Sequence, residues 1–129
     1  MSTIEATMTI QEVANRLTNL CRQGKYEEAQ RELYSDDADS IEPPHSKGAQ
    51  TVKGLDAIIK KGAEFQAMVE AVHGGSVSDP IIAGDHFAVA LVLDITMKGM
   101  GRTKMEELCV YEVKDGKVVK EQFFYSSTM

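Results

Sequence analysis

The sequence predicts an α+β fold, and three observations support this prediction. Apolar residues recur at helical spacing in residues 10–73, whereas residues 76–125 show the alternation and β-branched content of strands. The chain has 129 residues, of which 43% are apolar, which is enough for one hydrophobic core but too short for two domains. Helices and antiparallel strands that occupy separate parts of a chain are typical of α+β proteins. We therefore expect a single domain over residues 1–129.

The first helix is predicted to begin at Thr9, because Thr9 and Glu12 have the spacing of a capping box. Apolar residues then follow one helical face up to Gly24, which is well placed to end the helix. A shorter second helix is indicated in residues 25–34 and gives way at the polar run 35–37. A short strand over about residues 38–42 ends at a double proline, and residues 43–54 read as a surface loop.

A long third helix is predicted from Leu55 to Val72, since its apolar stripe continues for about five turns. Gly74 and Gly75 are expected to stop it, with His73 in its last turn. Strands follow at about 76–82, 87–96, 103–113 and 118–125, and residues 115–116 form a hairpin turn. A sheet that curves around helices makes a cone, and an incompletely filled cone is a small-molecule pocket.

Composition excludes several function classes. The formal net charge of −6 disfavours nucleic acid as a partner. No apolar run is long enough to span a bilayer and the first residues do not resemble a signal peptide, so we expect no membrane partner and a cytoplasmic location. Cys21 and Cys109 are too few for a disulfide framework, and the histidines do not stand at metal-ligand spacing. We expect neither a metal nor a cofactor.

Two segments, YSDDADSIEP (34–43) and DGKVVKEQFFY (115–125), together with the order of elements, resemble the NTF2-like superfamily. Within it the chain is similar to SnoaL-like and ketosteroid isomerase-like proteins from about Thr9 to Tyr125. The resemblance implies an NTF2-like (cystatin-like) cone in which three N-terminal helices pack on a curved antiparallel sheet. It implies no single activity, because this superfamily includes isomerases, cyclases, dehydratases, transport factors and binding proteins.

The resemblance also implies roles for three positions. Glu42, before Pro43, takes the place of the carboxylate that moves a proton between carbons in the steroid isomerases. The two groups that hold the oxyanion in those enzymes fall on Leu17 and Cys109, neither of which is an adequate donor. Isomerisation by that donor pair is therefore not expected here.

Matching the two-residue period to the family's inward face predicts which strand residues enter the cone. The candidate catalytic residues are Glu42, Asp94, Glu107 and Tyr125. The candidate ligand-binding residues are Leu17, Ala90, Val92, Cys109, Tyr111, Glu121 and Phe123. Two acids in one apolar cavity resist simultaneous ionisation and can divide the acid and base roles. The alternative is that the strand acids lie on a solvated face or at the mouth of the cone.

The opposite face of the strand at 87–96 is more apolar and comprises Phe87, Val89, Leu91, Leu93 and Ile95. Either a second copy of the chain covers this face in a homodimer, or the face assignment is inverted and the pocket is nearly all aliphatic. The first reading favours a cofactor-free isomerase or cyclase that acts on a small apolar molecule. The alternatives are a non-catalytic small-molecule-binding protein and a dimerisation module.

Overall fold

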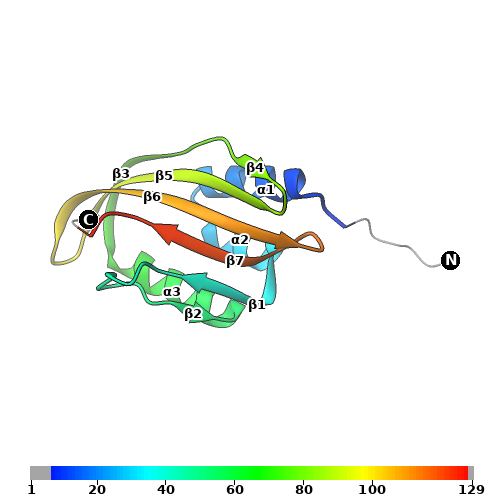
Figure 1. The fold of residues 1–129 in the computed structure, drawn as a ribbon. Coiled ribbons are helices and arrows are strands. Elements are labelled where there is room, and N and C mark those ends of the chain that lie inside the picture. Colours follow the sequence, from blue (N-terminus) through cyan, green and yellow to red (C-terminus); the bar gives the residue numbers. More distant parts are fainter. Residues whose placement is uncertain (1–6, 128–129) are drawn as a thin grey trace.

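The computed structural model describes residues 7–127, which form three helices and seven strands (Figure 1). The helices are α1 (Ile10–Arg22), α2 (Tyr26–Leu33) and α3 (Leu55–Met68). The strands are β1 (Tyr34–Ile41), β2 (Val52–Lys53), β3 (Val69–Val77), β4 (Ile81–Ala83), β5 (His86–Met97), β6 (Gly101–Lys114) and β7 (Lys117–Phe124). The α+β class predicted from the sequence is confirmed.

All seven strands belong to one sheet, in the order β2-β1-β7-β6-β5-β3, with β4 beside β5. The pairing of β1 with β7 is parallel, whereas the other pairs are antiparallel. The sheet is therefore mixed, and the expectation of a purely antiparallel sheet is wrong. The alternation within a strand sets its two faces but carries no information on the direction of a partner from the far end of the chain.

The first helix begins as predicted. The Thr9 hydroxyl accepts from the backbone N–H of Glu12, and the Glu12 carboxylate accepts from the backbone N–H of Thr9, which completes the capping box. Gly24 follows the helix with a φ of 73°, a conformation that glycine adopts without steric cost. Asp115 and Gly116 both have positive φ in the predicted hairpin turn between β6 and β7.

The third helix is shorter than predicted, because α3 ends at Met68 and the chain continues directly into β3. His73 lies in that strand, where its Nε2 is 2.7 Å from the Thr96 hydroxyl of β5. Gly75 is not a helix stop: a Cβ at this position would lie 2.7 Å from the carbonyl oxygen of Val92. The glycine instead permits close approach of β3 to β5. The valines here have a spacing that also fits a helix, but pairing with the long strand β5 makes this segment a strand.

The first strand also differs from the prediction. β1 starts at Tyr34, so the polar run 35–37 belongs to the strand rather than to a helix end, and Glu42 lies just beyond the strand. Within the predicted loop, Val52 and Lys53 form β2 against Ser40 and Asp39. Backbone hydrogen bonds to the neighbouring strands hold these residues in a strand, although the strand propensity of the polar run is low.

The face assignment of β5 is wrong. Residues opposite one another in an antiparallel pair share a face, and Leu91 lies opposite Glu107 while Val89 lies opposite Cys109. The odd-numbered residues of β5 therefore face inward. Ala90, Val92 and Asp94 lie on the outer face, as do Ala88 and Thr96.

Asp94 forms an ion pair on the outer face of the sheet. Its carboxylate is 2.8 Å from the Arg102 guanidinium on the outer face, and this arginine holds the pKa of Asp94 below its usual value. Asp94 is thus neither a cavity acid nor a proton donor to the cavity.

The core lies between the helices and the inner face of the sheet, where α1 contributes Val13, Ala14 and Leu17. Phe87 of β5 stacks on Tyr111 of β6, with ring centroids 4.8 Å apart. These large residues fill the end of the cone near α1. In Figure 1, β5, β6 and β7 curve together across the molecule, and α3 lies on the side of β1.

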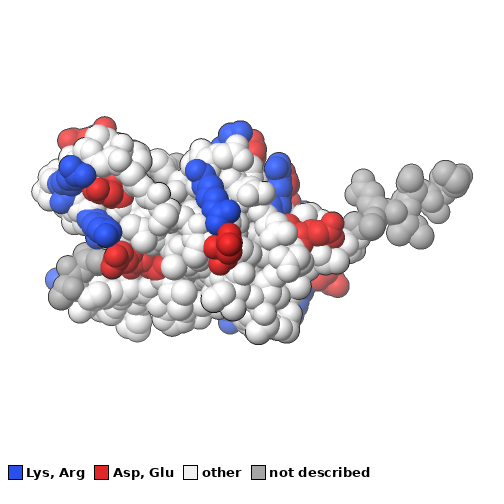
Figure 2. All heavy atoms as spheres, turned by 90° about the horizontal axis from the view of Figure 1, so that it is seen from above, with Lys and Arg blue, Asp and Glu red and all other residues white. Residues whose placement is uncertain are grey.

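Charged side chains of both signs lie next to one another on the surface. Figure 2 shows Lys and Arg beside Asp and Glu on the face seen from above, with uncharged areas between these groups. That face therefore presents no broad basic area among the described residues. Within residues 7–127, no helix has both the length and the apolar character needed to cross a membrane.

Candidate functional site

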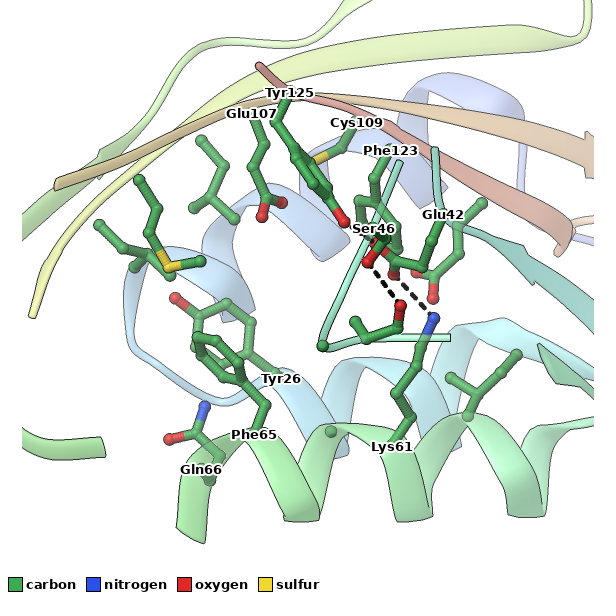
Figure 3. A pocket seen from close by; sticks show the side chains of 18 of the residues that line it. Tyr26, Glu42, Ser46, Lys61, Phe65, Gln66, Glu107, Cys109, Phe123 and Tyr125 are labelled. Carbon is green, nitrogen blue, oxygen red and sulfur yellow. Dashed lines mark hydrogen bonds and ion pairs between the residues drawn. The ribbon is translucent and has the colours of Figure 1, made fainter. Parts of the chain in front are cut away.

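A cavity of about 800 Å³ lies between the inner face of the sheet and the helices. Its walls come from all three helices, from β5, β6 and β7, and from the loop after β1. Figure 3 shows Tyr26, Phe65 and Gln66 on one side and Glu107 and Tyr125 on the other. The volume suits a small organic molecule.

Eight of the residues predicted for the site border this cavity. They are Leu17, Glu42, Cys109, Tyr111, Glu107, Glu121, Phe123 and Tyr125. Ala90, Val92 and Asp94 do not, because they lie on the outer face of β5. The aliphatic wall comes instead from Leu91 and Leu93 on the face of β5 that was assigned outward.

Glu42 is held by two neighbours. Lys61 of α3 lies 2.9 Å from its Oε2, and the Tyr125 hydroxyl donates to its Oε1 at 2.7 Å (Figure 3). The side chains of Lys61 and Glu42 are 15% and 7% exposed, so this is an enclosed ion pair. Both carboxylate oxygens of Glu42 are therefore engaged before any ligand enters.

Sequence reasoning missed Lys61. The residue lies three positions after Ile58 and four before Phe65, both of which line the cavity, so it falls on the apolar stripe of α3. A lysine within an apolar stripe is a signal that could have singled it out, because a buried charge needs a partner.

A second acid, Glu121, accepts hydrogen bonds at both carboxylate oxygens. The hydroxyls of Tyr34 and Ser40 donate to its two oxygens, the latter at 2.6 Å, and Lys61 donates to the Ser40 oxygen at 2.7 Å. Burial raises the pKa of Glu121, while the two hydroxyl donors oppose this shift. A continuous chain of hydrogen bonds thus runs from Tyr34 in the core to Glu42 at the cavity.

Glu107 is the third acid and differs from the other two. No hydrogen bond or ion pair to its carboxyl group is formed by any described residue, and the side chain extends into the cavity (Figure 3). Burial raises the pKa of Glu107 to about 7, and the negative charges of Glu42 and Glu121 contribute to the shift. Near neutral pH this carboxyl group can therefore both accept and release a proton.

The remaining titratable side chains at the cavity are poor proton carriers. Burial raises the pKa of Cys21 to about 12 and raises that of Cys109 further, so both remain neutral thiols. Burial, with the hydrogen bond to Glu42, also raises the pKa of Tyr125 to about 12. Within residues 7–127, no three His, Cys, Asp or Glu side chains are grouped so as to hold a metal ion.

The family model of the SnoaL-like domain matches residues 8–125. The chain belongs to the SnoaL-like family. This confirms its predicted place in the NTF2-like superfamily. A search of curated protein sequences finds no match to this SnoaL-like chain.

Solved structures similar to this SnoaL-like chain carry the same fold. A protein from Mesorhizobium loti, assigned both as a SnoaL-like polyketide cyclase and as a carbohydrate phosphatase, is 38% identical with a TM-score of 0.85, over 92% of this chain and 100% of that one. A protein from Streptomyces antibioticus, also assigned as a polyketide cyclase, is 20% identical with a TM-score of 0.67, over 90% and 91%. A ketosteroid isomerase-like fold from Catenulispora acidiphila is 22% identical with a TM-score of 0.70, over 92% and 88%.

Proposed function

We propose that this SnoaL-like protein is a cofactor-free isomerase or cyclase that moves a proton on a small, largely apolar molecule, with Glu107 as the acid and base. The observation that carries the proposal is the contrast among the three cavity acids. Glu42 and Glu121 accept hydrogen bonds at both oxygens, whereas Glu107 accepts none from the described residues. A catalytic base needs a free oxygen near the substrate and a pKa near the working pH.

Glu107 rather than Glu42 is then the base. Protonation of Glu42 would leave the enclosed Lys61 ammonium group without its ion-pair partner. Glu107 stands between the aliphatic wall of β5 and the open cavity, and its protonation breaks no ion pair among the described residues. Glu42 as the base remains a prediction, and undiminished proton exchange in Glu107→Gln would favour it.

The proposed step balances within one carboxyl group. A C–H bond next to a carbonyl group breaks, its proton passes to a Glu107 oxygen, and the electron pair moves toward the carbonyl oxygen. In an isomerisation the same carboxyl group returns the proton to carbon at another position. In a ring closure the enolate carbon attacks a second carbonyl group of the molecule, a C–C bond forms, and the carboxyl group gives the proton to the resulting alkoxide oxygen. The cyclase assignment, one of two that a 38% identical protein carries, supports this class of reaction.

A second candidate, non-catalytic binding, is favoured by the composition of one part of the cavity. Leu91, Leu93, Met97 and Met105 form an aliphatic wall on β5 and β6. Such a wall holds an apolar molecule by burial of its surface, with no chemical step.

Hydrogen–deuterium exchange of 2-tetralone separates these candidates. This apolar ketone has acidic C–H bonds next to its carbonyl group, and NMR in D₂O follows their loss. We expect exchange above the buffer rate, and a loss of about 10²–10⁴-fold in Glu107→Gln. Glu106→Gln is the matched control, since its side chain lies on the outer face. Binding of 2-tetralone without faster exchange would favour the second candidate.

We also propose that the protein pairs with a second copy through the outer face of the sheet. The apolar residues of β5 that were predicted to form this contact face inward. Leu108 and Phe124, however, lie opposite one another on the outer face and are 46% and 48% exposed. Ala90 is opposite Leu108 on the other side. A twofold contact would bury this apolar strip against itself.

A further inference from the structure

The Lys61 ammonium group has an unused donor at the cavity. It donates to the Ser40 hydroxyl at 2.7 Å and to Glu42 Oε2 at 2.9 Å. A lysine ammonium group carries three N–H donors, and no described residue supplies a third acceptor. Because Lys61 borders the cavity, the third N–H is available to an oxygen atom of a ligand.

The surrounding residues hold this ammonium group in place. Ser40 and Glu42 fix it from β1 and from the loop that follows, and Ser40 is itself anchored by Glu121. The Phe123 ring lies beneath the charge, with its centroid 5.5 Å from Nζ. A donor that is fixed before the reaction stabilises developing charge without reorganisation during the step.

Few other cavity groups offer a donor to an oxygen atom, and the one unengaged hydroxyl among those considered, that of Tyr26, carries no charge. Leu17 has no polar side-chain atom, and burial keeps Cys109 a neutral thiol, which is a weak donor. The Tyr125 hydroxyl already donates to Glu42. Of the two lysines that border the cavity, Lys47 is exposed, whereas Lys61 is enclosed and can stabilise charge on a ligand oxygen.

We propose that Lys61 is a catalytic residue that donates its third N–H to a carbonyl oxygen of the substrate. This inference rests on the proposed function, because the oxygen gains charge only when Glu107 removes a proton from the adjacent carbon. The C–H electron pair moves onto that oxygen, which becomes an enolate held by Lys61. When carbon regains the proton, the electron pair returns and the enolate becomes a neutral carbonyl group again.

The charges at the cavity also define the substrate class. Glu42 is paired with Lys61, whereas Glu107 adds negative charge when it ionises. A permanently anionic substrate would place a like charge beside Glu107 in an enclosed site. We therefore expect an uncharged, largely apolar ketone or ester with a C–H bond next to the carbonyl group.

Binding of a stable enol analogue tests the donor. The probe is 2-naphthol, which resembles the enol of 2-tetralone, and 2-methylnaphthalene is the comparison because it lacks an oxygen. We expect the wild type to prefer 2-naphthol by about tenfold or more, which Lys61→Met loses. The matched control is Lys60→Met, at the exposed neighbouring position of α3, which should keep the preference. No preference in the wild type, or an unchanged preference in Lys61→Met, would overturn the proposal.

A double variant separates donation from charge balance. Lys61→Met leaves Glu42 buried and unpaired, so a lower rate alone would also fit a structural role. In Lys61→Met/Glu42→Gln both charges are gone. We expect 2-tetralone exchange to remain about 10²-fold or more below that of Glu42→Gln alone. Exchange restored to the Glu42→Gln rate would reject donation by Lys61.

The two readouts keep this inference distinct from the proposed function. Glu107→Gln should lose exchange yet retain the preference for 2-naphthol, because binding does not require proton removal. If the wild type shows the preference without exchange, the proposed function fails while Lys61 remains an oxygen-binding donor. If exchange occurs without the preference, the proposed donation by Lys61 is rejected, while the proposed role of Glu107 as acid and base is retained.

Discussion

Glu107 of β6 lies directly opposite Leu91 of β5, on the inner face of the sheet. This pairing sets a carboxyl group that has no hydrogen-bond partner among the described residues against an aliphatic wall of the cavity. The wall removes water from one side of the group, and the two other cavity acids oppose its ionisation. The chemistry proposed for the cavity follows from this placement.

Glu107→Gln should change how stability depends on pH. Burial raises the pKa of Glu107 from 4.5 to about 7, so its contribution to stability is present below pH 4.5 and is lost as the pH rises through 7. At pH 8 the variant should exceed the wild type by at most about 3 kcal/mol in free energy of unfolding. Urea unfolding at pH 5 and pH 8 measures the difference. A gain that is equal at both pH values would contradict the assignment.

Tyr34→Phe should destabilise the protein, because it removes one of the two hydroxyl donors to the buried Glu121 carboxyl group. We expect a loss of about 1–3 kcal/mol in free energy of unfolding. The control is Tyr26→Phe, since the Tyr26 hydroxyl forms no hydrogen bond with the described residues. Equal losses in both variants, measured by urea unfolding, would show that the Glu121 contact is not the cause.

Gly75→Ala should weaken the pairing of β3 with β5. The added Cβ would lie 2.7 Å from the Val92 carbonyl oxygen, a backbone atom that cannot move without shifting the strand. We expect a loss of about 1–3 kcal/mol, as for other overpacked sites. At the neighbouring Gly74 a Cβ meets no atom within 4 Å, so Gly74→Ala should be close to neutral. Thermal unfolding that ranks the two variants in the opposite order would reject this explanation.

Leu108→Glu should reduce self-association, since it places a charge in the centre of the proposed outer contact. Sedimentation velocity at micromolar concentration should show a dimer for the wild type and a monomer for the variant. Val72→Glu, on an exposed position of β3, is the control and should remain a dimer. A monomeric wild type would contradict the proposed pairing.

Local signals in the sequence predicted most of the fold. The capping box at Thr9, the glycine after α1 and the hairpin at 115–116 each depend on neighbouring residues, and each is present. The end of α3 was missed because the valines of β3 satisfy both helical spacing and strand propensity. Only the partner strand β5 decides between them.

The faces of the strands were predictable in part. The turn at 98–100 has three residues, so Met97 lies opposite Gly101 and odd-numbered residues of β5 face odd-numbered residues of β6. That parity requires Leu91 to accompany Glu107 and excludes Ala90 and Asp94 from the cavity. Lys61 was harder to predict, because its partners Ser40 and Glu42 come from a distant part of the chain.

The protonation state of Glu107 can be measured from its carboxyl ¹³C resonance by NMR from pH 4 to pH 9, with Glu107→Gln as the assignment control. We expect a titration midpoint near 7, because the group is enclosed and has no hydrogen-bond partner among the described residues. A midpoint near 4.5 would mean that the group is solvated or paired. Glu107 could not then serve as the acid and base of the cavity.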